Sequence, residues 1–292
     1  MWYNERVEIF FDFYGSFKMT LKEFFGFGGY ERSAEGYMSW QHLLFVSILV
    51  VIMATGAIVF GIRYRNRDFK EKNRVLMISA ILIDAFELFK IVILCIRHGD
   101  AFFWVNVLPL FLCSIQLITI PLAAFSRVRV KEAALDFITI FGMLCAILGT
   151  YCAGNNYAVY PVISFDNVVS GITHVIAGFC ALYIMISGMT DMKKKNIPVT
   201  VGILGGFCIA AYIANIFTDC NYMFLSRGDG TPYDIVFNWV SGNQILYPIL
   251  VVALFVVYIA AFYQVYYLIA SRARRRQECQ ASTEESRVET TV

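Results

Sequence analysis

The chain has 292 residues, of which 59% are hydrophobic and 16% charged, and its formal net charge at neutral pH is +2. This composition excludes an ordinary soluble domain, in which about half of the residues are apolar and about a quarter charged. The small net charge gives no reason to expect a nucleic-acid partner. Apolar runs of about twenty residues instead predict a polytopic membrane protein, whose partners are membrane lipids.

The N-terminal segment, residues 1–41, mixes aromatic and charged side chains, and no run in it is long enough to cross a bilayer. Phenylalanines alternate with acidic and basic residues as far as Gly26, Gly28 and Gly29. This pattern predicts an amphipathic helix in the membrane interface that ends near these glycines. The alternative is a folded cap on the bundle.

Seven apolar stretches follow, each long enough for an α-helix that crosses a bilayer. They comprise residues 43–62, 75–96, 101–125, 133–152, 168–186, 199–217 and 245–270. The sequence therefore predicts an all-α bundle of seven transmembrane helices over residues 42–270. Residues 271–292 are basic and then polar, which predicts a disordered tail.

The distribution of positive charge predicts the orientation of the bundle. The first, third and fifth loops and the tail hold 17 of the 24 lysines and arginines, whereas the N-terminal segment and the other loops hold six. Positive charge is retained on the cytoplasmic side of a membrane. The N-terminus is therefore expected outside and the C-terminus in the cytoplasm, in a multi-pass protein of the cell membrane.

The third apolar stretch carries most of the unusual polar residues. On one helix over 101–125, Asn106, Pro109, Cys113 and Gln116 would share a face, because they are spaced by three, four or seven residues. Polar groups in hydrocarbon are costly unless they face protein or water. This face is therefore expected to point into the bundle.

The predicted topology gathers the polar residues toward one side of the membrane. Cys113 would lie about 16 Å below the outer surface and His174 about 9 Å below it, at 1.5 Å per helical residue. The other residues expected in this outer half are Glu87, Lys90, Asn215, Asp219, Asn221 and Tyr222. Together they predict a cavity that is open to the outer leaflet or to water.

Cys113 and His174 form the sharpest candidate catalytic pair. A thiolate is a good nucleophile, and a neighbouring imidazole can accept the thiol proton. His174 is the only histidine within a predicted span, since His42 and His98 lie at span ends. The alternatives are that Cys113 is a packed apolar thiol and that His174 bonds to a backbone carbonyl.

Three ionisable residues, Asp84, Glu87 and Lys90, are spaced by three and share one side of the second predicted span. They predict a salt-bridged clamp between helices, and the alternative is a headgroup site or a proton relay. Asp136 has no local partner and could pair with Lys90 across the bundle. Gln116 could orient a substrate carbonyl or bond to another helix.

The eight cysteines show no ligand-like spacing such as CxxC, and most lie inside predicted spans. Buried thiols of this kind usually act as small apolar fillers. The sequence therefore predicts no metal site and no cofactor.

Short motifs give the chain a family resemblance. LPLFLCSIQ (108–116), the span with His174 and NYMFL (221–225) resemble YwaF-like bacterial membrane proteins, which in turn resemble the transmembrane protein 164 family. The resemblance covers most of residues 40–270 and implies a seven-helix fold with inward-facing polar residues. It also implies a lipid acyltransferase that works through an intramembrane cysteine, which corresponds here to Cys113, with His174 as its natural partner.

Two main classes of function remain open. In a lipid acyltransferase or acyl hydrolase, Cys113 would attack an acyl ester and His174 would act as base and then as acid. Gln116 or Asn221 would help to hold the oxyanion. The remaining candidate substrate-binding residues are Asn106, Glu87, Lys90 and Tyr222. In a transporter or small-molecule-binding protein, the site would instead be formed by Asp84, Glu87, Lys90 and Asp136, and Cys113 would only pack. A third hypothesis is a structural partner in a membrane complex.

Overall fold

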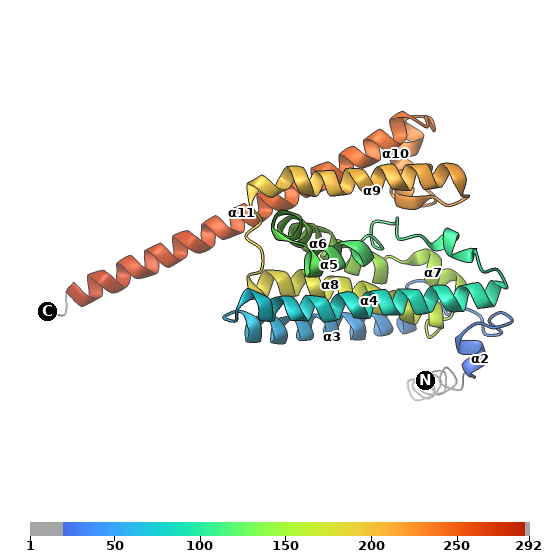
Figure 1. Cartoon of the computed structure of the whole chain (residues 1–292), viewed down its shortest axis with the longest axis horizontal. Helices are drawn as coiled ribbons and strands as arrows, with labels where there is room; N and C mark the ends of the chain where they lie inside the picture. The colour runs from blue at the N-terminus through green and yellow to red at the C-terminus, as the bar shows by residue number, and fades with distance from the viewer. Residues whose placement is uncertain (1–19, 290–292) are drawn as a thin grey trace, which may run out of the picture.

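In the computed structural model, residues 20–289 are described, with side chains up to Arg272, and helices make up the fold of this part of the chain (Figure 1). The longer helices are α3 (Trp40–Tyr64), α4 (Phe69–His98), α5 (Gln116–Phe125), α6 (Val128–Thr150), α8 (Phe165–Ser187), α9 (Ile197–Phe217) and α11 (Leu246–Glu289). The shorter ones are α2 (Leu21–Phe24), α7 (Gly154–Val159), α10 (Tyr233–Trp239) and the 3₁₀ turns η1 (Phe103–Val107), η2 (Lys194–Asn196) and η3 (Tyr222–Phe224).

Five of the described helices are long and apolar enough to cross a membrane, namely α3, α6, α8, α9 and α11. Helix α4 is also long, but its apolar part contains three charged residues, Asp84, Glu87 and Lys90. Helix α5 has only ten residues. The described part of the chain is therefore all-helical, with five clear candidate spans of a membrane protein.

Helix α6 is the centre of the bundle. In Figure 1, α5 and α6 lie between α9 and α11 on one side and α3, α4 and α8 on the other. One face of α6 packs against α9 and α11 through Phe137 and Phe141. Its other face packs against α4, α5 and α8 through Ala134 and Ile138. Most large side chains of α3, in contrast, are exposed on the outside of the bundle, as expected for a surface in contact with lipid.

Local signals in the sequence fix several helix ends. Ser39 caps α3 and Ser164 caps α8, because each side chain accepts a hydrogen bond from a backbone N–H in the first turn. Gly99 and Gly188 end α4 and α8 in the left-handed conformation, with φ of 64° and 68°. This conformation costs a glycine little, which is why glycine commonly follows the last helical turn.

Small residues bring α6 and α8 close together. A Cβ on Gly142 would lie 2.8 Å from the carbonyl oxygen of Ala177, and one on Gly178 would lie 2.6 Å from the Cβ of Ala146. Contacts of this kind let helix backbones approach within a membrane, where van der Waals packing drives association. The interface between α6 and α8 therefore has little room for larger side chains.

The third apolar stretch is not one helix, so the expected common face of Asn106, Pro109, Cys113 and Gln116 is wrong. The chain forms η1, then an irregular turn over residues 108–115, and only then α5. The residue before Pro109 is extended, with φ −59° and ψ 148°, because a proline disfavours the helical conformation of its predecessor. We call residues 108–115 the cysteine turn.

Asp136 is buried in α6 and has its own partners, so its expected pairing with Lys90 is also wrong. Its carboxylate accepts hydrogen bonds from Thr190, from Asn196 at 2.9 Å and from the Tyr263 hydroxyl at 2.9 Å. These donors lie after α8, at the start of α9 and on α11. Lys90 is near the opposite end of the bundle, since α4 finishes where α8 begins.

Replacing Asp136 by alanine is expected to lower the stability of the protein by about 3 kcal/mol, because three donors lose a charged acceptor. Thermal unfolding in detergent would measure the loss as a lower midpoint. Thr139→Ala is the matched control, since Thr139 is also buried in α6 but donates only to Leu135 O within its own helix. Equal midpoints for the two variants would contradict the role given to Asp136.

Much of the predicted interfacial helix falls on residues 1–19, which lie outside the described residues. The described part of this segment packs on the bundle: the rings of Phe24 and Phe25 lie 6.0 Å and 5.1 Å from that of Phe165. The Tyr30 hydroxyl donates to Asp166 at 2.6 Å, and Arg97 pairs with the same carboxylate at 2.9 Å. Residues 20–39 therefore form a cap over the ends of α4 and α8.

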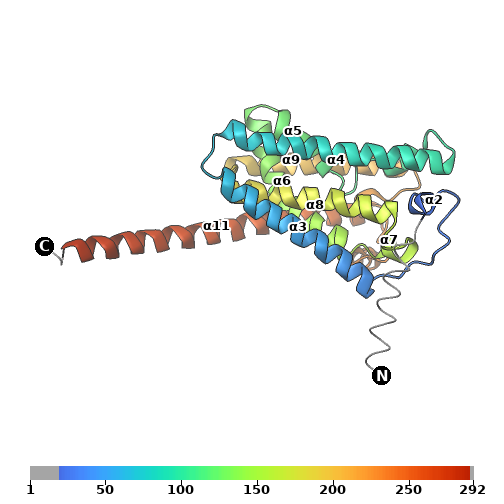
Figure 2. The same ribbon diagram turned by 90° about the horizontal axis from the view of Figure 1, so that it is seen from below.

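The C-terminal segment differs from the expected disordered tail. Helix α11 continues without a break as far as Glu289 and extends away from the bundle, as Figures 1 and 2 show. The segment after residue 271 contains mainly arginine, glutamate, glutamine and alanine. These residues have high intrinsic helix propensity, which explains why the helix is extended there.

Candidate functional site

The cysteine turn leads from η1 to α5 with its backbone groups bonded locally. The Ser114 hydroxyl accepts from Phe111 N at 3.0 Å and donates to Phe111 O at 3.1 Å. Cys145 of α6 donates its thiol to Leu112 O at 3.3 Å. Irregular backbone at membrane depth is tolerated only where protein or a cavity surrounds it. The turn thus presents Cys113 from a break between helices.

The side chain of Cys113 meets groups from three helices. Its thiol lies within electrostatic range of the imidazole of His174 on α8, without a hydrogen bond between the two side chains among the described residues. Lys90 of α4 and Cys145 of α6 interact with the same sulfur electrostatically. A thiol and an imidazole that are far apart in sequence thus lie within electrostatic range of each other.

The hydrogen bonding of His174 defines which ring nitrogen faces the site. Nδ1 lies 2.6 Å from the carbonyl oxygen of Ser170, one helical turn earlier. A carbonyl oxygen can only accept, so Nδ1 carries the proton of the neutral ring. Nε2 is then an acceptor; it is buried and has no ordinary hydrogen-bond partner among the described residues. The imidazole is thus held as a base with its lone pair free.

Gly149 of α6 provides the space for this ring. A Cβ at Gly149 would lie 1.8 Å from Cδ2 and 2.0 Å from Nε2 of His174. Carbon atoms in contact are normally about 3.5–4.0 Å apart, so any side chain here would displace the ring. The position of the base therefore depends on the absence of a side chain on the neighbouring helix.

Glu87 and Lys90 form an ion pair within α4, with Nζ and Oε1 2.6 Å apart. The side chains are 11% and 21% exposed, respectively. The predicted clamp between two helices is thus a bond within a single helix, as a spacing of three residues allows. Asp84 lies one turn earlier on α4 and interacts electrostatically with Glu87, but it makes no ion pair within the described part of the chain.

Gln116 is buried at the start of α5, one turn after Cys113, and its backbone N–H donates to Cys113 O at 3.3 Å. The side-chain oxygen accepts from Thr119 at 3.0 Å. Its Nε2 is buried and has no hydrogen-bond partner among the described residues. Gln116 therefore holds an unused N–H donor group next to the cysteine turn.

Asn221 and Tyr222 organise the loops at the predicted outer end. The Asn221 amide donates to Arg227 O at 2.6 Å and to Asp229 at 2.8 Å, so its N–H groups are already engaged. The Tyr222 hydroxyl donates to Val105 O at 3.0 Å and accepts from Leu108 N at 3.1 Å. Burial raises the pKa of Tyr222 to about 12, which keeps the hydroxyl protonated. Tyr222 thus fixes the point at which the cysteine turn begins.

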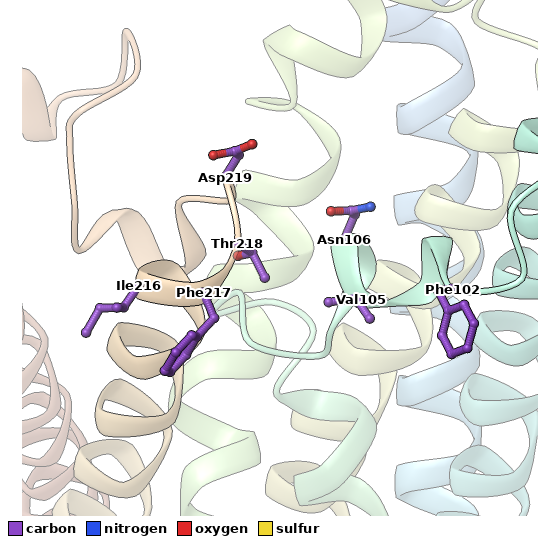
Figure 3. Close-up of a pocket in the computed structure, with 7 residues that line it drawn as sticks. All are labelled: Phe102, Val105, Asn106, Ile216, Phe217, Thr218 and Asp219. Carbon is purple, nitrogen blue, oxygen red and sulfur yellow. The ribbon is translucent and has the colours of Figure 1, made fainter.

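Asn106 is not part of the Cys113 surroundings that the sequence predicted. It is exposed on η1 and lines a groove of about 440 Å³ between η1 and the end of α9. Figure 3 shows its amide on one side of this groove, with Phe217, Thr218 and Asp219 on the other. The break at Pro109 separates Asn106 from the helical face on which Cys113 was expected.

The sequence reasoning missed two residues that shape the site, Gly149 and Ser170. Ser170 contributes a backbone oxygen, for which a sequence holds no signal beyond its place one turn before His174. Gly149 did have a signal: Gly142 and Gly149 are seven residues apart, or two helical turns, as are Gly171 and Gly178. Such spacing of small residues indicates close helix contact in a membrane.

Comparison with known proteins identifies the family of the chain. No curated protein and no solved structure matches it. The TMEM164 family profile matches residues 37–274, which cover the bundle from the start of α3 to the part of α11 just beyond its apolar segment. The match therefore includes the cysteine turn, α4, α6 and α8. On this match over most of its length, the chain belongs to the TMEM164 family.

Proposed function

We propose that this membrane protein is an acyl-transfer enzyme that acts on lipid esters through a thioester on Cys113. The observation that carries the proposal is the state of His174, whose Nδ1 is bonded to Ser170 O while Nε2 is buried, unpaired and beside the thiol. A nucleophile, a base and a group that orients the base are the elements of covalent acyl transfer. The backbone carbonyl of Ser170 fills the third role.

In the first half-reaction, Nε2 of His174 accepts the thiol proton as the Cys113 sulfur attacks the ester carbonyl carbon. The tetrahedral intermediate then collapses, the carbon–oxygen ester bond breaks, and His174 returns the proton to the departing lysolipid oxygen. The acyl chain remains on sulfur as a thioester. The second half-reaction is the reverse with a new acceptor: a lysolipid hydroxyl or water gives its proton to Nε2, attacks the thioester, and Cys113 leaves as a thiol.

The negative charge on the intermediate requires a hydrogen-bond donor that is not already engaged. Of the two amides considered for this role, Gln116 is the better supported. Its Nε2 is buried and unpaired next to the cysteine turn, whereas the Asn221 amide is committed to Arg227 O and Asp229. We therefore assign the oxyanion donor to Gln116.

The proposed topology keeps seven crossings of the cell membrane, with the N-terminus outside. The third crossing would be made jointly by η1, the cysteine turn and α5, which places Cys113 inside the bilayer. The many exposed large side chains on α3 and α11 would face lipid. Lipid substrates could then approach the site without leaving the membrane.

Transport, the alternative function, has weaker support from the same groups. Glu87 and Lys90 neutralise each other within α4. Asp136 lies near the other end of the bundle and is bonded to Thr190, Asn196 and Tyr263. Apart from Asp84, the ionisable residues that a transporter site would need are therefore already paired or hydrogen-bonded, at two separate places in the bundle.

The covalent intermediate gives a direct test. The protein in phospholipid vesicles would be digested after brief reaction, and mass spectrometry would search the peptide that contains Cys113 for an added acyl chain. We expect an adduct that hydroxylamine removes, because hydroxylamine cleaves thioesters. His174→Ala should reduce its yield at least tenfold through loss of the base. An unmodified Cys113 peptide, in a protein that nevertheless transfers acyl chains, would exclude the thioester.

A further inference from the structure

A cavity of about 440 Å³ lies at the end of the bundle where α4 and α6 begin and where the chain passes from α8 to α9. Its polar lining includes Lys131 and Glu132 of α6, together with Lys193 and Asn196 of the segment between α8 and α9. None of the described residues that line it belongs to the cysteine turn. The cavity is therefore separate from the proposed acyl-transfer site, and we call it the lysine cavity.

The lysine cavity lies at the basic end of the bundle. The turn from α3 to α4 and the segment from α8 to α9 are at this same end, on the left in Figure 1. The Tyr183 hydroxyl near the end of α8 donates to Lys72 O at 3.1 Å, and the Asn73 amide donates to Ala124 O near the end of α5 at 2.8 Å. These bonds bring the basic residues of 63–74, 127–131 and 193–195 to one end, which the proposed topology places in the cytoplasm.

Lys131 brings a positive charge to this cavity that no carboxylate in the described part of the chain neutralises. Its Nζ bonds to Asn73 Oδ1 at 3.0 Å and to Ala124 O at 3.3 Å, which are both neutral acceptors. It also lies 5.4 Å from the ring centroid of Phe69, another residue of the lining. An ammonium group has three N–H donors, so one remains for a ligand. Lys131 is therefore complementary to an anion.

The carboxylates at the cavity do not cancel its positive charge. Glu132 accepts from Lys193 and from Lys195, each at 3.1 Å, so two lysines share one carboxylate. Asp191 also lines the cavity and is exposed. Lys131 and the two lysines on Glu132 thus outnumber the two carboxylates by one. The balance of charge favours a ligand with negative charge.

The apolar part of the lining borders the lipid-facing surface. Phe69 at the start of α4 is 46% exposed, and Val128 at the start of α6 is 80% exposed. No side chain caps α6, and the N–H groups of a first helical turn attract anions. Anionic phospholipids are enriched in the cytoplasmic leaflet, where basic pockets between membrane helices bind their headgroups. A lipid can therefore place its phosphate in the cavity and its chains over the two exposed side chains.

We propose that the lysine cavity binds a phosphate group, supplied by the headgroup of an anionic membrane lipid, with Lys131 as its main cationic partner. This inference goes beyond the acyl-transfer function and does not depend on it, because the cavity shares no residue with the cysteine turn. The ligand would be held at the opposite ends of α5 and α4 from those that border the proposed catalytic residues.

Native mass spectrometry of the full chain in detergent can test the proposal. The two lipid probes are dioctanoyl phosphatidate and dioctanoylglycerol, which lacks only the phosphate. We expect phosphatidate to bind at least about tenfold more tightly, and Lys131→Gln to weaken its binding about fivefold, since the variant removes one lysine charge and keeps an N–H donor. Phosphatidate titrations of Lys131→Gln and of the parent that superimpose would overturn the proposal.

Inorganic phosphate is the third probe, and it identifies the source of the phosphate group. If it neither binds nor displaces phosphatidate at millimolar concentration, the lipid is the ligand, as proposed. If it binds in a manner that depends on Lys131 and phosphatidate binds no more tightly, the ligand is a soluble phosphate compound, and the lipid is rejected as the source.

Three variants complete the test. Lys193→Gln provides the measurement if Lys131→Gln does not fold, because Glu132 keeps Lys195; binding should weaken about threefold, and an unchanged affinity would contradict the proposal. Lys70→Gln is the matched control, since Lys70 is an exposed lysine of the same basic end that does not line the cavity. An equal loss in Lys70→Gln would reduce the effect to general surface charge and reject the site.

Cys113→Ser separates this inference from the proposed function. It should bind phosphatidate as tightly as the parent even if it transfers no acyl chains. If Cys113→Ser loses the binding and Lys131→Gln does not, the lipid is bound at the cysteine turn, and the lysine cavity is not its site.

Discussion

Replacing Cys113 by serine is expected to lower acyl transfer at least about 10³-fold, because a serine hydroxyl is almost never ionised near neutral pH and is a much weaker nucleophile than a thiol. Transfer of a labelled acyl chain from phospholipid to lysolipid in vesicles would measure the loss. The variant should keep its thermal midpoint to within a few degrees, since oxygen replaces sulfur in a turn whose backbone bonds do not involve this side chain.

Cys180→Ala is the control for this experiment. Cys180 is a buried thiol on α8, the same helix as His174, and it belongs to the cluster of apolar residues between α4, α5, α6 and α8. This variant removes a thiol from the core but keeps the proposed nucleophile. Its activity should remain within about threefold of that of the parent when measured below the unfolding temperature of the variant. If Cys113→Ser turns over acyl chains as fast as Cys180→Ala, the nucleophile is not Cys113.

Gly149→Ala is expected to lower the same activity about 10²-fold, since a misplacement of about 1 Å in a catalytic group can cost that much. The added Cβ would overlap the His174 ring, because it would lie only 1.8 Å from Cδ2 and 2.0 Å from Nε2. The imidazole must rotate or α6 must move outward, and either change takes Nε2 away from the thiol. The loss should appear in the turnover rate, because the lipid-facing surface of the bundle is unchanged.

Gly178→Ala is the matched control, because it inserts a methyl group into the same interface between α6 and α8. Its Cβ would meet Met53 Sδ at 2.3 Å and Ala146 Cβ at 2.6 Å, and no catalytic group. Overpacking of this kind costs about 1–3 kcal/mol, so both variants should be less stable to a similar degree. Equal losses of activity in the two variants would show that Gly149 affects the enzyme only through stability.

Much of the membrane architecture can be read from composition, because each long apolar run except the third lies within a single long helix. Counting residues along the predicted spans also predicted that Cys113 and His174 lie in the same half of the bundle, and their side chains are within electrostatic range of each other. Depth can be counted in this way because a helix advances by a constant rise per residue. The prediction required only approximate helix boundaries.

The local geometry of the site could not be predicted by counting residues along helices. The expected helix over residues 101–125 ignored the effect of Pro109 on its predecessor, and so Asn106 was assigned to the wrong surface. Asp136 was expected to pair with Lys90 across the bundle, whereas its actual partners are neutral donors from three different parts of the chain. Polar contacts between distant segments depend on how helices pack, which a single sequence does not specify.

The break before α5 has a consequence for the electrostatics of the thiol. Had the third apolar stretch been one helix, Cys113 would lie near its middle, where successive peptide dipoles cancel. Instead the α-helix begins at Gln116, so the partial positive charge of its first turn lies next to the cysteine turn. A helix start favours anionic sulfur. Pro109, which keeps the preceding residue out of a helix, thereby also contributes to the chemistry at Cys113, four residues further along the chain.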